Sequence, residues 1–164
     1  MRLPSERGFT LIELLVTLSI AAILLAIAVP SYSGSRLNSQ LRASSNDLIG
    51  SINLARSEAI KGGTSVTLCA SSDGLTCSGG WGNGWVVLRG ADVLHTVSAI
   101  PAGFQLTESS GTVTLQFQST GVDATPAVFT LCRSSPSVGS QERVVSMDAT
   151  GRAFVRRTSL GACS

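Results

Sequence analysis

Two features near the start of the chain could support chemistry: a glycine that precedes an apolar segment, and a carboxylate inside that segment. From Phe9 to Val29 the chain carries no charged residue except Glu13. About 21 residues at about 1.5 Å each span about 31 Å, enough to cross the hydrocarbon core of a bilayer. A carboxylate in such surroundings is costly unless a cation pairs with it. Glu13 therefore predicts a cationic partner, in a membrane or in an assembly of chains.

An ordinary secretory signal peptide is the alternative interpretation of this segment. It would need a shorter apolar core, of about 7–15 residues, followed by a small-residue cleavage site. The charged part, Met1–Gly8, is very short here, and only Ala26-Ile27-Ala28 resembles such a site. A plain signal anchor would explain the length of the segment but not its carboxylate.

The residues Gly8-Phe9-Thr10-Leu11-Ile12-Glu13-Leu14 resemble the start of a type IV pilin-like protein. The resemblance implies cleavage by a prepilin peptidase between Gly8 and Phe9, where a small residue lets the backbone enter the active site. It also implies methylation of the new Phe9 amine, which keeps its positive charge. Glu13 would pair with the Phe9 amine of a neighbouring subunit, or with its own.

A second pattern predicts that the helix continues beyond the apolar segment. Pro30 should kink it, because proline removes one hydrogen bond and clashes with the preceding turn. Apolar residues then recur on one helical face, and Gly62-Gly63 ends the pattern after Lys61. The residues of this face are Leu37, Leu41, Leu48, Ile52, Ala55 and Ala59.

The remainder of the chain is typical of an antiparallel β-sheet or a small sandwich. Clear strand patterns lie at 64–69, 85–88, 113–117, 128–132 and 143–147, and weaker ones at 93–97, 104–106 and 153–156. The predicted class is α+β, with the C-terminal half of a long helix packed on the sheet. The predicted parts are a leader (1–8), a membrane or fibre-core half-helix (9–29), an amphipathic half-helix (30–63) and a β-rich domain (64–164).

Three further stretches resemble the GspH/FimT-type family of minor pilins and type II secretion pseudopilins. They are Ala55–Lys61, Val66–Gly74 and Trp81–Val87. The resemblance implies assembly of the helices into a fibre core. It also implies a single-pass protein of the bacterial inner membrane with a periplasmic C-terminal domain, which then enters a pilus or pseudopilus.

Four cysteines follow the apolar segment, an even number that is typical of disulfides formed after export. Three pairings are possible, and we favour Cys69–Cys77 and Cys132–Cys163. The first would close a loop around a turn sequence, and the second would restrain the C-terminal end of the chain. Their spacing contains no C-x2-C motif, so no metal site is expected.

No residue pattern predicts an enzyme or a cofactor. The single histidine, His95, has no nucleophile elbow to accompany it. Trp81, Trp85 and the nearby glycines could form a carbohydrate platform. A hairpin with Asn83-Gly84 at its turn and tryptophans in the core is the simpler interpretation.

The C-terminal part holds the only cluster of positive charge. Arg152, Arg156 and Arg157 are candidate DNA-binding residues, because some proteins of the resembled family bind DNA through Gly-Arg, any residue, then Arg. Gly151-Arg152 fits this motif, but Phe154 stands where the second arginine is expected. A solvated edge strand with protective charges is the alternative. The net charge of +2, or +1 without the leader, provides no general attraction for nucleic acid.

The sequence thus predicts a structural subunit, a minor pilin that helps to prime or cap a type IV pilus. A minor pseudopilin of type II secretion is the second hypothesis, and a DNA-binding minor pilin of a competence pilus is the third. The expected partners are a prepilin peptidase, other minor and major pilins, the inner membrane and, in the third hypothesis, DNA. No metal and no cofactor are expected.

Overall fold

The structure is a computed structural model that describes residues 9–122, 124–134 and 142–158. The chain divides into two compact units, residues 1–36 and residues 37–164. Gly8 and Cys163 lie outside the described residues.

One long helix, α1 (Leu11–Gly62), belongs to both units. It contains 52 residues and runs through Pro30, so this proline does not end the helix. The kink predicted at Pro30 stays a prediction. The helix ends at Gly62 with Lys61 in its last turn, as the sequence predicts.

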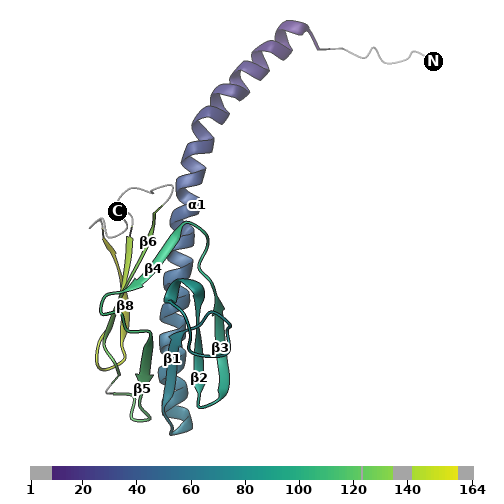
Figure 1. Ribbon diagram of the computed structural model, residues 1–164. Coiled ribbons are helices and arrows are strands. Elements are labelled where there is room, and N and C mark those ends of the chain that lie inside the picture. The colour runs from purple at the N-terminus through teal and green to yellow at the C-terminus, as the bar shows by residue number, and fades with distance from the viewer. Residues whose placement is uncertain (1–8, 123, 135–141, 159–164) are drawn as a thin grey trace, which may run out of the picture. The chain divides into compact units, whose positions relative to one another are not determined.

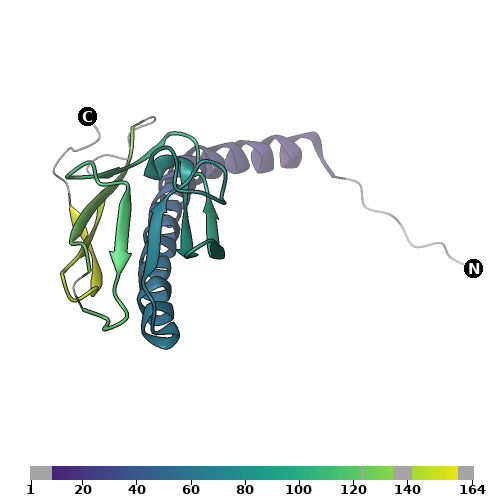
Figure 2. The ribbon, with the colours of Figure 1, turned by 60° about the horizontal axis from the view of Figure 1, so that its bottom comes forward.

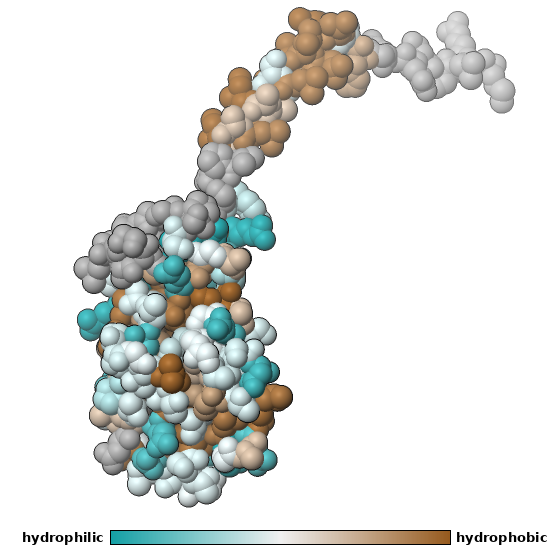
Figure 3. Space-filling view, in the orientation of Figure 1, coloured by the Kyte–Doolittle hydropathy of each residue, from teal (hydrophilic) through white to brown (hydrophobic). Residues whose placement is uncertain are grey.

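The N-terminal part of α1 is apolar on all sides. Leu11–Ala28 is long and apolar enough to cross a membrane, and none of this stretch is buried within the structure. Figure 3 shows the hydrophobic colour spread over this segment, whereas the surface of the second unit is mixed. A helix that is hydrophobic on every side requires lipid or other helices around it.

Among the described residues, eight strands form two antiparallel sheets of four strands each, which confirms the predicted α+β class. Sheet A has the order β3-β2-β1-β5, and sheet B has the order β4-β6-β7-β8. Their bounds are β1 (Val66–Ala70), β2 (Gly84–Arg89), β3 (Asp92–Ser98), β4 (Phe104–Glu108), β5 (Thr114–Phe117), β6 (Ala127–Arg133), β7 (Glu142–Met147) and β8 (Ala153–Thr158). Each contains or overlaps one of the eight strand patterns seen in the sequence.

The second half of α1 and both sheets share one hydrophobic core. The predicted apolar face is confirmed, since Leu41, Ile52 and Ala59 are fully buried and Leu37 is partly buried against the core. Figure 1 shows β2 and β3 on one side of this half of α1 and β4, β6 and β8 on the other. The turned view in Figure 2 shows the same arrangement. The helix is therefore the central element on which both sheets pack.

The predicted hairpin at Asn83-Gly84 is wrong. Trp81–Asn83 forms a short 3-10 helix, η1, and Gly84 is already the first residue of β2. Gly84 has a φ of +113°, and a Cβ atom there would lie 2.4 Å from the carbonyl oxygen of Val97. The glycine is needed because the backbones of β2 and β3 approach closely here. Local sequence suggests a turn, but strand pairing decides the conformation.

Candidate functional site

The carboxylate that interrupts the apolar segment lies in the first turn of α1. Thr10 precedes the helix, and its Oγ1 accepts a hydrogen bond from the backbone N–H of Glu13 at 3.3 Å. Its carbonyl oxygen accepts from the N–H of Leu14 at 3.2 Å. Thr10 is thus the N-cap and Glu13 the third helical residue, the spacing of a capping box. Thr10 is not among the site residues expected from the sequence, although the pattern T-x-x-E signals this cap.

The electrostatics of this helix end suit a carboxylate. The unpaired N–H groups and the helix dipole place partial positive charge at the N-terminus of a helix. Glu13 is exposed there, and Phe9, four residues earlier, is 83% exposed. Both are therefore open to an incoming chain. Chemically, the end of the helix presents an anionic oxygen that can accept a cation from a second molecule.

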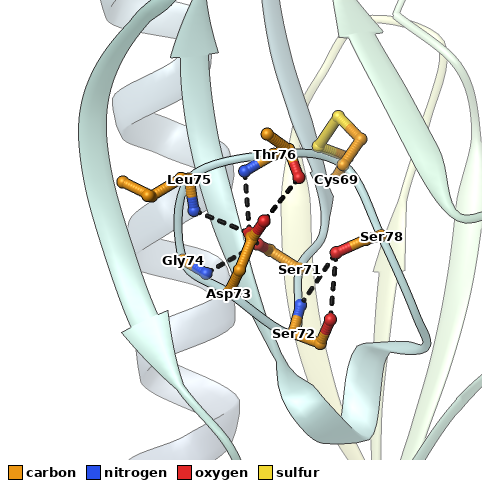
Figure 4. The surroundings of a disulfide bond; sticks show 9 residues. Cys69, Ser71, Ser72, Asp73, Gly74, Leu75, Thr76 and Ser78 are labelled. Carbon is orange, nitrogen blue, oxygen red and sulfur yellow. Dashed lines mark hydrogen bonds between the residues drawn. A yellow bond between two sulfur atoms is a disulfide. The ribbon is translucent and has the colours of Figure 1, made fainter.

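A disulfide closes a tight loop after β1. Cys69 and Cys77 are bonded, with 5.5 Å between their Cα atoms. Inside the loop, Asp73 Oδ1 accepts hydrogen bonds from the N–H groups of Leu75 and Thr76, as Figure 4 shows. The hydroxyl of Thr76, then its backbone N–H, holds the pKa of the Asp73 carboxyl well below its usual range. Both oxygens are engaged within the loop, so Asp73 has a structural role.

The second predicted disulfide, Cys132–Cys163, stays a prediction. Cys132 is buried on β6, and Cys163 lies outside the described residues.

Two of the three candidate DNA-binding arginines lie on opposite faces of sheet B. On β8, side chains alternate between the two faces of the sheet, so Arg156 and Arg157 point to opposite sides. Arg156 lies over the ring of Phe154, with 5.1 Å between its Cζ atom and the ring centroid. Arg152 directly precedes β8, and its carbonyl accepts a hydrogen bond from the N–H of Asp148 at 3.2 Å. DNA binding through these residues stays a prediction.

The glycine of the Gly-Arg pair has a structural explanation. Gly151 has a φ of +71°, and a Cβ atom there would lie 3.2 Å from Cδ of Arg56. Its N–H donates to the carbonyl of Asp148 at 2.9 Å, and Asp148 Oδ1 accepts from the N–H of Arg152 at 3.0 Å. The β7–β8 turn therefore requires this glycine whether or not a ligand binds nearby.

Both tryptophans belong to the core. Trp81 and Trp85 are 4% and 1% exposed, so neither can serve as a stacking platform for a ligand. The indole N–H of Trp81 donates to the carbonyl of Thr112 at 2.8 Å, and that of Trp85 to Ser51 Oγ at 2.9 Å. His95 is exposed on β3. Within the described ranges, no three His, Cys, Asp or Glu side chains lie together as a metal site would require.

Comparison with protein families agrees with this arrangement. The family described as Type II transport protein GspH matches residues 44–151. The chain belongs to the GspH family. The motif described as the prokaryotic N-terminal methylation motif matches residues 3–29, the part that contains Gly8, Phe9 and Glu13. Membership in this family, together with the motif, implies processing by a prepilin peptidase and assembly with other pilins. It is also consistent with membrane anchoring before assembly.

Solved structures show the same fold as this GspH-family chain. The type IV minor pilin FimU of Pseudomonas aeruginosa PAO1 is similar with a TM-score of 0.61 and 22% identity, over 77% of this chain and 96% of FimU. The minor pseudopilin EpsH of the Vibrio cholerae type 2 secretion system is similar with a TM-score of 0.52 and 15% identity, over 72% of this chain and 97% of EpsH. No curated protein sequence matches. At these identities the likeness shows the fold alone.

Proposed function

We propose that this chain is a minor pilin that helps to prime or cap a type IV pilus. The observation that carries the proposal is the position of Glu13, in the first turn of an exposed apolar helix and four residues after Phe9. The methylation motif over the same residues and the fold shared with the minor pilin FimU support it.

The mechanism follows from the cost of burying charge. Cleavage after Gly8 leaves a cationic amine on Phe9, and methylation keeps that charge. In the low-dielectric core of a fibre, Glu13 of one subunit pairs with the amine of its neighbour. A subunit out of register leaves two buried charges unpaired, which costs about 3–5 kcal/mol. The pair therefore selects one register from the many that an apolar helix alone would allow.

The proposed setting has two stages. Before assembly, the apolar segment lies in the bacterial inner membrane, with the C-terminal domain in the periplasm. The subunit then leaves the bilayer for the fibre, where other pilins surround its helix. Glu13 stays close to cations in both stages, because each chain brings its own Phe9 amine.

A minor pseudopilin of a type II secretion system is the second candidate. The printed description of the matched family and the fold shared with EpsH favour it. The two candidates use the same chemistry and differ in the machine that they serve. A strain that lacks the chain separates them, with surface pili and secreted proteins measured side by side. We expect loss of pili with normal secretion, whereas normal pili with lost secretion would identify a pseudopilin.

The assembly role is tested by Glu13→Val. Removing the charge should leave membrane insertion intact, because an apolar helix inserts more readily without it. Recovery of the chain in sheared fibres should fall by about tenfold or more, since about 1.4 kcal/mol already corresponds to tenfold.

Ser19→Val is the matched control for that variant. It removes a polar group of the same apolar segment that only donates to the carbonyl of Leu15 at 2.8 Å. It should enter fibres as the wild type does. Equal recovery of Glu13→Val and Ser19→Val would contradict the pairing role.

A further inference from the structure

The buried face of sheet B ends in a charged residue. On β7 the residues Arg143, Val145 and Met147 alternate onto the same side of the sheet. Val145 and Met147 belong to the core, and Arg143 itself is only 5% exposed. A guanidinium is always charged in proteins, and burying it is unfavourable unless hydrogen bonds and counter-charges compensate. The burial of the Arg143 charge therefore requires an explanation.

Two neutral acceptors hold the Arg143 side chain. Nη1 donates to the carbonyl of Glu142 at 3.0 Å, and Nη2 donates to Asn38 Oδ1, on α1, at 2.6 Å. These bonds fix the plane of the guanidinium between β7 and the helix. Neither acceptor neutralises its charge.

Two more arginines converge on the same place. Arg157 is the direct partner of Arg143 in the β7–β8 register. Arg42 follows Asn38 by one helical turn, so it lies on the same side of α1. Burial lowers the pKa of the Arg143 guanidinium, and the like charges of Arg157 and Arg42 lower it further. We call Arg42, Arg143 and Arg157 the arginine cluster.

Nothing in the described part of the chain neutralises the arginine cluster. None of its members forms an ion pair with a described carboxylate. Glu142 is next to Arg143 in sequence, but alternation places its side chain on the opposite face of β7, where it accepts a hydrogen bond from Thr158 at 3.1 Å. Three cations from three elements thus lie near one another without a described counter-charge.

We propose that the arginine cluster receives a carboxylate of the adjoining pilin subunit in the fibre. This inference rests on the proposed function, which supplies that neighbour. Arginine pairs with a carboxylate through charge-assisted N–H···O bonds. Arg143, whose Nη atoms already donate to Glu142 and Asn38, contributes its positive charge from the buried side. Arg42 and Arg157 are exposed, so they can close on the incoming group.

The helix of this chain indicates the kind of group that would fit. Asp47 lies about two and a half turns beyond Asn38, which places it on the opposite side of α1, and it is exposed. Fibres form through contacts that join different surfaces of successive subunits. A subunit with a similar helix would therefore present its carboxylate toward the arginine cluster of the next.

Charge reversal at the two exposed members tests the proposal. In the full chain, Arg42→Glu combined with Arg157→Glu should leave the membrane level unchanged and lower recovery in sheared fibres by about tenfold or more. Arg143 is left in place, because its removal would leave Asn38 without its donor. The matched control is Arg152→Glu combined with Arg156→Glu, which makes the same change of charge away from the cluster. It should stay within about twofold of the wild type.

A photo-crosslinker at position 157 identifies the class of ligand. We expect an adduct with a pilin subunit, in a peptide that contains Asp or Glu. Changing that acidic residue to Arg should restore recovery of the Arg157→Glu variant to within about twofold of the wild type. An adduct with a phospholipid or with DNA would overturn the proposal, because the cluster would then bind phosphate.

The set of variants recovered in fibres distinguishes a failure of this inference from a failure of the proposed function. One outcome would refute only the role of the arginine cluster. In it, the wild type and the charge-reversed variant both enter fibres, whereas Glu13→Val does not. If the wild type is absent from fibres, the proposed function fails first.

Discussion

A buried hydrogen bond between α1 and β2 provides a quantitative test of the fold. The indole N–H of Trp85 donates to Ser51 Oγ at 2.9 Å, and that hydroxyl donates to the carbonyl of Asp47 at 2.9 Å. Trp85 and Ser51 are each 1% exposed, so water cannot replace the serine. Ser51→Ala removes the acceptor and leaves the indole N–H unsatisfied in the core.

Two opposing effects determine how much the free energy of unfolding falls in Ser51→Ala. A buried donor left without a partner costs about 1–3 kcal/mol. Alanine favours the helix over serine by about 0.5 kcal/mol, which offsets part of this loss. We therefore expect Ser51→Ala to lower the free energy of unfolding by about 0.5–2.5 kcal/mol. Pulse proteolysis of the full chain over a urea series, in detergent, measures it.

Ser45→Ala is the matched control on the same helix. Ser45 is 2% exposed, but its hydroxyl only donates back to the carbonyl of Leu41 at 2.6 Å. Its loss leaves no donor unsatisfied, so stability should change by less than about 0.5 kcal/mol. In a double-mutant cycle with Trp85→Phe, the coupling of Ser51 to Trp85 should be about 1–2 kcal/mol. Equal effects of Ser51→Ala and Ser45→Ala, with no coupling, would refute the reasoning.

Three other predictions concern the domain. Gly84→Ala should destabilise it by about 3 kcal/mol or more, since the new Cβ would lie 2.4 Å from a β3 carbonyl oxygen; the same urea series measures this. Asp73 has a lowered pKa, so its carboxylate stabilises the fold above its ordinary pKa of 3.8, and this is lost as the pH falls below that value. Asp73→Asn should therefore make unfolding less dependent on pH below about pH 4. Non-reducing peptide mapping should join Cys132 to Cys163, and a peptide that joins Cys132 to any other cysteine would contradict this pairing.

Much of the fold could be predicted from local patterns. The apolar period of the helix predicts its buried face, including Leu41 and Ile52, because only one stripe of a helix can pack on a sheet. The strands follow from alternation and from the turn residues between them. Even the end of α1 at Gly62 could be read from the sequence. These features depend on residues close together in the chain.

What depends on distant contacts could not be predicted. The strand order β3-β2-β1-β5 is decided by pairing across the sheet, and no local pattern encodes it. Gly84 looks like a turn residue until its contact with β3 is known. Arg156 and Arg157 are adjacent in sequence but lie on opposite faces, whereas Arg143 and Arg157 become neighbours only through the β7–β8 register.

The central claim is that this chain is a processed subunit of a fibre. Mass spectrometry of sheared fibres tests it most directly, because the N-terminal peptide reports cleavage, methylation and incorporation together. We predict a peptide that begins at methylated Phe9, and its loss from fibres in Gly8→Val, where the leader stays attached. A chain that still begins at Met1 in cells with an active prepilin peptidase, and that is absent from the fibre fraction, would contradict the account.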